Sequence, residues 1–155
     1  MTVESEIGKW FARKIPKAWF RGPPDVGADD VEVLVIGELP GGVSPGGFRE
    51  ETRERRIEIA REAEQLFGRK VSWGVRAGDQ QQVFTSLAVP VMTRLRLPER
   101  RLLDTLVDAG VARSRSDALA WCVRLVGTHE GDWLKDLDDA LAAVRRVRKE
   151  GPRAV

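Results

Sequence analysis

The sequence predicts an α+β protein, with a small α/β layer in its N-terminal half and helices in its C-terminal half. Residues 31–37 form a β-branched, mostly apolar run that is typical of a central strand. Residues 49–67 carry apolar side chains at the helical period. Beyond residue 98, further helical stretches are separated by Gly110 and Gly127, so the second half is expected to be mainly helical.

The composition indicates a folded protein and excludes several classes of protein. The chain has 155 residues with a net charge of +2, and 42% of its residues are hydrophobic, which suits one folded domain or two small ones. A single cysteine excludes an internal disulfide, and a single histidine argues against a histidine-rich metal site. The sequence has no long apolar run and no signal-peptide pattern at its start, so we expect a cytoplasmic protein without a membrane span.

The N-terminal segment combines basic and aromatic residues. Residues 1–8 are expected to be a loose terminus, and residues 9–21 hold five basic residues and four aromatic ones, with Pro16 breaking any single helix. Basic residues with interleaved aromatic ones can form an arm that binds nucleic acid. We favour the alternative, in which the aromatic rings pack on the N-terminal sheet, namely those of Trp10, Phe11, Trp19 and Phe20.

The α/β layer is predicted from the elements that follow. After the strand at 31–37, the glycine- and proline-rich residues 40–47 are expected to form a flexible loop. A long helix over 49–67 should end at Gly68, and strands are expected at 70–76 and 83–88. The apolar stripe of the long helix consists of Ile59, Ala60, Ala63, Leu66 and Phe67.

The second half changes character at Pro90. Residues 91–97 alternate as a short strand, and Pro98 opens a helix that extends to Ala109. Ser114 and Asp117 have the spacing of a capping box, which predicts a second helix up to Val126. A third amphipathic helix is expected over 132–149, and it ends in basic residues. Basic side chains stabilise the C-terminus of a helix, and we favour this role over a contact with DNA. The predicted domains are therefore 1–89, 90–127 and 128–155.

This order of strand, helix, turn and capped helix over residues 91–126 resembles the ribbon-helix-helix family of DNA-binding proteins. The similar stretches are Met-Thr-Arg-Leu-Arg-Leu-Pro at 92–98, Leu-Leu-Asp-Thr-Leu-Val-Asp-Ala-Gly at 102–110 and Arg-Ser-Arg-Ser-Asp-Ala-Leu at 113–119. The whole chain also resembles uncharacterised actinobacterial proteins that share the run from Phe67 to Gly74, a likeness that supplies no function.

A ribbon-helix-helix module needs two copies of the chain. A lone strand has unpaired edges, and pairing the same strand from two chains buries Leu95 and Leu97 against the helices. Alternation then puts Arg94, Arg96 and Met92 on the opposite face, where a ribbon can read the major groove.

The resemblance also implies where the module meets the DNA backbone. In this family the start of the second helix holds a phosphate, and helix N-termini suit anions in general. The residues at this position are Arg113, Ser114, Arg115 and Ser116, and Arg100 and Arg101 are candidates for additional DNA contact.

The sequence therefore predicts a homodimeric, nucleoid-associated protein that binds double-stranded DNA, a transcriptional regulator without a cofactor, a metal or catalytic residues. The alternative is an antitoxin-like interaction module, in which the ribbon only dimerises the chain and the N-terminal domain binds a protein. A less favoured alternative is a nucleotidyltransferase-like enzyme in which Asp30 and Glu32 hold Mg²⁺, since alternation puts both carboxylates on one strand face.

Overall fold

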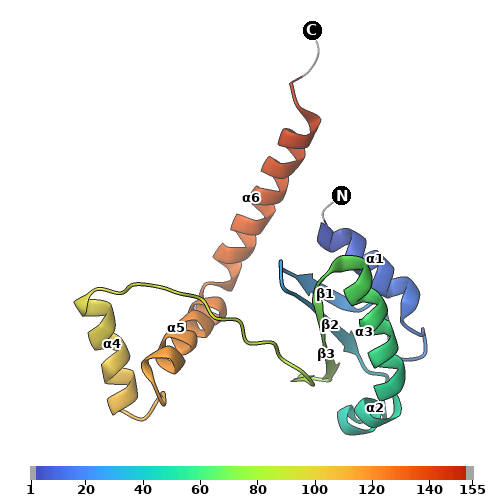
Figure 1. The fold of residues 1–155 in the computed structure, drawn as a ribbon, viewed down its shortest axis with the longest axis horizontal. Helices are drawn as coiled ribbons and strands as arrows, with labels where there is room; N and C mark the ends of the chain where they lie inside the picture. Colours follow the sequence, from blue (N-terminus) through green and yellow to red (C-terminus); the bar gives the residue numbers. More distant parts are fainter. Residues whose placement is uncertain (1–2, 153–155) are drawn as a thin grey trace. The chain divides into compact units, whose positions relative to one another are not determined.

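The computed structural model describes residues 3–152, which form two compact units. The first unit extends to Pro90 and the second begins at Val91. The first contains a sheet with three helices and the second contains three helices, so the predicted α+β class is confirmed (Figure 1).

The first unit is built on a four-stranded sheet with the strand order β1-β2-β3-β4. Strand β1 (Asp25–Ala28) pairs antiparallel with β2 (Glu32–Glu38), and β2 pairs parallel with β3 (Lys70–Ala77). Strand β4 (Gln80–Val83) returns antiparallel to β3 through a tight turn. The parallel pair requires a crossover connection, which α2 (Pro45–Glu51) and α3 (Arg53–Phe67) supply.

Helices cover one face of this sheet (Figure 1). Helix α1 (Val3–Lys14) contributes Ile7 and Phe11, which are fully buried, and α3 contributes Ile59 and Ala63. Four aromatic side chains, Trp10, Phe11, Trp19 and Phe20, pack in this core, as the sequence predicted. Their rings meet Trp73, Phe48 and Phe67 edge to face or at a tilt, a geometry that adds to the energy of burial.

Several predicted elements in this unit are corrected. The expected loose terminus is largely helical, because α1 begins at Val3 and buries an apolar face that a short window does not reveal. The predicted loop 40–47 contains the start of α2, where Ser44 caps the helix by accepting a hydrogen bond from the Gly47 amide at 3.0 Å. A break at Thr52 divides the predicted helix 49–67 into two.

Other predictions hold or shift by a few residues. Gly68 ends α3 with a φ of 66°, the left-handed conformation that glycine adopts most readily. Leu66, placed in the apolar stripe, is 59% exposed. The last strand is β4, so most of the predicted strand 83–88 is irregular. The sequence did not predict β1, because its four residues include only one β-branched side chain.

The second unit consists of α4 (Leu97–Asp108), α5 (Arg115–His129) and α6 (Gly131–Glu150). Its core is small, with Leu103, Ala112 and Ala118 buried. Half-buried apolar side chains pack around these three, namely Leu95, Leu106, Val107, Leu119 and Cys122.

Two predictions in the second unit need correction. Helix α5 continues through Gly127 to His129, because its α-helical hydrogen bonds extend to a C-cap at Glu130. The predicted strand 91–97 has no partner strand among the described residues, and Leu97 begins α4 with Pro98 in its first turn. Leu97 is consequently 52% exposed rather than directed inward.

We predict that Gly37→Ala destabilises the first unit. A Cβ atom at Gly37 would lie 2.3 Å from the ring of Phe20, which is itself buried, so the ring or the strand must move. Such overpacking costs about 1–3 kcal/mol. Chemical denaturation should show this loss for Gly37→Ala and a much smaller change for Gly27→Ala, where no atom lies within 4 Å of the added Cβ.

Candidate nucleic-acid interface

Residues 91–96 form an extended segment before α4, with side chains in two different environments. Leu95 is half-buried against the small core of the second unit. Arg94 and Arg96, on either side of it, are exposed, and Met92 is 97% exposed. Among residues 91–97 only Leu95 is half-buried, and Thr93 and Leu97 are exposed like the arginines, so the predicted alternation is not seen over this segment. The contact of Leu95 with the core presents both arginines to the surface.

Arg100 and Arg101 have different surroundings. The Nη1 atom of Arg100 donates a hydrogen bond to the carbonyl oxygen of Leu95 at 2.6 Å, and the side chain is half-buried. This bond ties the extended segment to the first turn of α4. Arg101 is exposed and lies one residue further along the helix. Arg100 therefore positions the segment, whereas Arg101 faces the surroundings.

The N-terminus of α5 is closed by reciprocal hydrogen bonds. The Ser114 hydroxyl accepts from the Asp117 amide at 3.1 Å, which is the predicted cap. The Asp117 carboxylate accepts from the Arg113 amide at 3.0 Å, so the chain is fixed on both sides of the cap. All four predicted phosphate contacts are exposed here, namely Arg113, Ser114, Arg115 and Ser116.

Arg115 connects α5 to α4 through a bidentate ion pair. Its Nε and Nη2 atoms donate to the two carboxylate oxygens of Asp104 at 2.7 and 2.8 Å. The hydrogen bonds from Arg115 lower the pKa of the Asp104 carboxyl below its ordinary value, and the same pair raises the pKa of Arg115. Arg115 thus fixes the helix N-terminus, and part of its donor capacity is already used.

The first unit contains a second concentration of positive charge, which the sequence interpretation did not single out. Arg49, Arg53 and Arg56 lie beside Phe84 around a depression of about 420 Å³ that Glu50 also lines. The signal was the spacing of the three arginines, four and then three residues apart, which puts them on one side of a helical segment.

Arg56 is the structural member of this cluster. It is 7% exposed, with Nε bonded to the Thr52 hydroxyl at 3.0 Å and Nη2 bonded to the Arg49 carbonyl at 2.8 Å. Its guanidinium carbon lies 5.0 Å from the centre of the Phe84 ring. Burial, followed by the charges of Arg49 and Arg53, lowers its pKa. Arg56 therefore joins the break between α2 and α3 to the chain that leaves β4.

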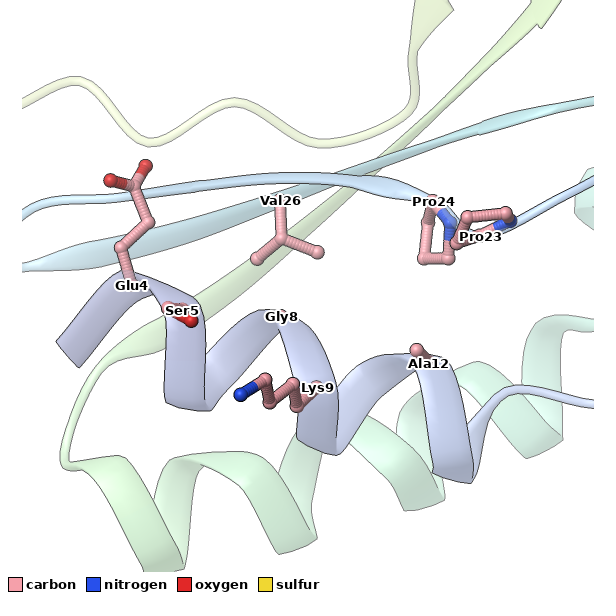
Figure 2. Close-up of a pocket in the computed structure, with 8 residues that line it drawn as sticks. All are labelled: Glu4, Ser5, Gly8, Lys9, Ala12, Pro23, Pro24 and Val26. Carbon is pink, nitrogen blue, oxygen red and sulfur yellow. The ribbon is translucent and has the colours of Figure 1, made fainter. Parts of the chain in front are cut away.

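A shallow depression of about 440 Å³ lies between α1 and β1 (Figure 2). It is lined mainly by small and aliphatic groups, with Glu4, Ser5 and Lys9 along the α1 side. Gly8 lies opposite Val26, where an added Cβ would come within 4.0 Å of the valine Cβ. The depression lies where α1 passes β1, and the residues that line it include no cluster of catalytic groups.

Asp30 and Glu32 have separate surroundings. The Glu32 carboxylate accepts hydrogen bonds from the Ser72 hydroxyl and, at 3.3 Å, from the Leu87 amide. Asp30 is fully exposed, with one carboxylate oxygen 4.0 Å from Arg69. Within residues 3–152, no group of three or more His, Cys, Asp or Glu side chains is placed to hold a metal ion. Glu32 instead fastens the chain after β4 to the sheet.

Comparisons with known proteins match both units. The Rv1265-like protein N-terminal domain matches residues 5–83, and the Mb1296 C-terminal domain matches residues 96–148. The uncharacterized proteins Mb1296 of Mycobacterium bovis and Rv1265 of Mycobacterium tuberculosis are each 53% identical over 160 residues, covering 96% of this chain and 71% of theirs. The predicted likeness to actinobacterial proteins is confirmed, and neither domain description names a DNA-binding family. No solved structure matches the chain.

No helix in the described part of the chain combines the length and the hydropathy that a membrane span requires.

We predict that acid weakens the α4–α5 connection through Asp104. Because the folded-state pKa of Asp104 lies below its ordinary value, this stabilisation is complete above the unfolded-state pKa and is lost as the pH falls through the folded-state value. Thermal unfolding of wild type and Asp104→Asn should therefore differ near neutral pH and converge as the pH falls through the lowered pKa of the Asp104 carboxyl. A difference that stays constant over this range would contradict the role assigned to the ion pair.

Proposed function

This chain belongs to the Rv1265-like family, and we propose that it is a homodimeric DNA-binding protein that acts as a transcriptional regulator. In this proposal residues 91–96 of two chains pair as an antiparallel ribbon that enters the major groove. The proposal concerns the second unit and assigns no cofactor and no catalytic residue.

The arrangement around Leu95 carries the proposal. Leu95 contacts the core of the second unit, whereas Arg94 and Arg96 are exposed on an extended backbone that has no strand partner among the described residues. Arg100 takes up the carbonyls of Leu95 and Arg96, and a strand edge such as the backbone before them favours the addition of another strand. The same segment of a second chain supplies such a strand and doubles the number of arginines on the exposed face.

The chemistry of this face suits DNA. The major groove of B-DNA admits a two-stranded ribbon, and arginine donates two hydrogen bonds to O6 and N7 of guanine. Arg94 and Arg96 would make these contacts, and Met92 would add an apolar contact on the same face. Arg100, through its bond to the Leu95 carbonyl, would hold the ribbon on α4.

The start of α5 would fix the module on the DNA backbone. Helix N-terminal amides and the dipole of the helix favour a phosphate, and Arg113 and Ser116 are exposed beside them. Arg115 contributes mainly by holding this terminus to Asp104. The carboxylate of Asp117 opposes the phosphate, so the neighbouring arginines are needed to offset its charge. Arg101 would add a backbone contact from α4.

A protein-interaction module is the second candidate function. Large apolar side chains are exposed along α4 and α5, among them Leu102, Val123 and Val126, which are 53%, 65% and 48% exposed. Exposed apolar surface of this kind marks a site for another protein. In this alternative the ribbon only joins two copies, and a protein partner binds one of the two units.

The two functions differ in their dependence on salt. We predict that DNA fragments bind the full chain with an affinity that falls steeply as salt rises, because phosphate contacts release counterions. Arg96→Ala should weaken binding to a specific site by about 1–3 kcal/mol, and Arg94→Ala/Arg96→Ala should abolish the preference for that site. Fluorescence anisotropy at two salt concentrations measures both effects.

The matched control removes the same charge from the first unit. Arg55→Ala/Arg61→Ala changes two exposed arginines of α3 and should leave DNA affinity close to that of wild type. Equal affinity of wild type and the Arg94/Arg96 double variant would overturn the ribbon assignment. A dimer that binds no DNA at low salt would favour the protein-interaction module.

A further inference from the structure

Helix α6 presents an apolar stripe that nothing in the described chain buries. Leu134, Leu137, Leu141 and Val144 follow one another at intervals of three, four and three residues, the a/d spacing of a coiled coil. They are 39%, 43%, 49% and 53% exposed, and no side chain of α6 is buried. Trp133, Ala140 and Val147 widen the stripe along one side.

A helix of this kind needs a partner. Helices gain most of their stability in water from packing of an amphipathic face, because intrinsic propensity is small. The spacing of the stripe fits another helix better than a flat surface, since a and d side chains insert between the residues of a facing helix. The partner of α6 is therefore expected to be a helix.

The charges of α6 identify which helix fits. Residues 131–140 contain four aspartates and one lysine, a net charge of −3, and residues 141–150 contain four basic residues and one glutamate, a net charge of +3. The two minority charges are neutralised within the helix, Lys135 by Asp139 at 3.0 Å and Glu150 by Arg146 at 4.0 Å. An acidic half and a basic half of equal charge thus remain on one helix.

The helix dipole does not account for this separation. The dipole favours acidic residues in the first turn and basic residues in the last turn, and its effect fades beyond them. Asp136 and Asp138 lie past the first turn, and Arg145 lies before the last one. Their placement needs an external partner whose charges run in the opposite direction.

We propose that α6 pairs antiparallel with α6 of a second copy of this chain. In the antiparallel arrangement the acidic half of each helix lies against the basic half of the other, and the two leucine-rich stripes bury each other. A parallel arrangement would put like charges side by side over both halves, which is destabilising. The pairing does not depend on DNA binding, and it gives the chain a self-association surface separate from residues 91–96.

A thiol at the middle of the helix tests whether α6 pairs with itself. Ala140 lies on the edge of the stripe near the midpoint, so Ala140→Cys in a Cys122→Ala background brings two introduced thiols together across the pair. Mild oxidation of the full chain should give a cross-linked dimer on a denaturing gel. The same product should form in the Arg94→Ala/Arg96→Ala background, which separates this pairing from the proposed function. Circular dichroism checks that every variant is folded.

Charge variants then test the orientation. Asp136→Lys/Asp138→Lys and Arg145→Glu/Arg148→Glu each leave one sign of charge along most of the helix, and each should lower the cross-linking yield roughly fivefold. A variant with all four changes, the fully reversed helix, reverses the sign of both halves to +1 and −1 and should recover part of the yield. When wild-type and fully reversed helices are mixed, antiparallel pairing predicts cross-links within each kind only.

Three outcomes would overturn the proposal. Absence of a cross-link in a folded chain would assign the stripe to another partner or to the chain's own first unit. Equal yields of cross-linked dimer for all charge variants would show that the charges do not direct the pairing. Cross-links formed mainly between wild-type and fully reversed helices would establish a parallel arrangement instead.

Discussion

The second unit has more apolar surface than its own core can bury, and much of its organisation follows from this constraint. Leu103, Ala112 and Ala118 are buried, whereas large apolar side chains on α4, α5 and α6 are exposed. Small domains bury a smaller fraction of their surface than large ones and are only marginally stable, so additional contacts stabilise them. In both proposed associations, the ribbon at residues 91–96 and the pairing of α6, a second copy of the chain would bury part of this surface.

The first unit fully or partly buries most of its large apolar side chains within one chain. Its aromatic residues come from α1, from the segment after it, and from α2, α3 and β3, and they pack together in one core. Gly37 leaves room for the ring of Phe20, because a Cβ atom at this position would lie 2.3 Å from ring atoms of Phe20. This core gives the first unit its own stability, so that the unpaired surface is concentrated in the second unit.

In both units arginine side chains hold segments together as well as presenting charge. Arg100 holds the carbonyl of Leu95, Arg115 holds Asp104, and Arg56 holds Thr52 and the Arg49 carbonyl. The guanidinium group can do this because it offers several donors in one plane. The net charge of +2 therefore does not show that the arginines fall into two groups. Some of them bond to other segments of the chain, and others, such as Arg94 and Arg96, are exposed.

Local patterns in the sequence determined the elements whose cause is local. The end of α3 at Gly68, the cap at Ser114 and the strand β3 depend on neighbouring residues, and the structure confirms all three. The tertiary structure decided what depends on distant contacts: the helical start at α1, the pairing of β1 with β2, the burial of Arg56 and the ion pair of Arg115 with Asp104. A charged side chain looks the same in a sequence whether it faces solvent or a carboxylate on another helix, and only the fold brings the two groups together.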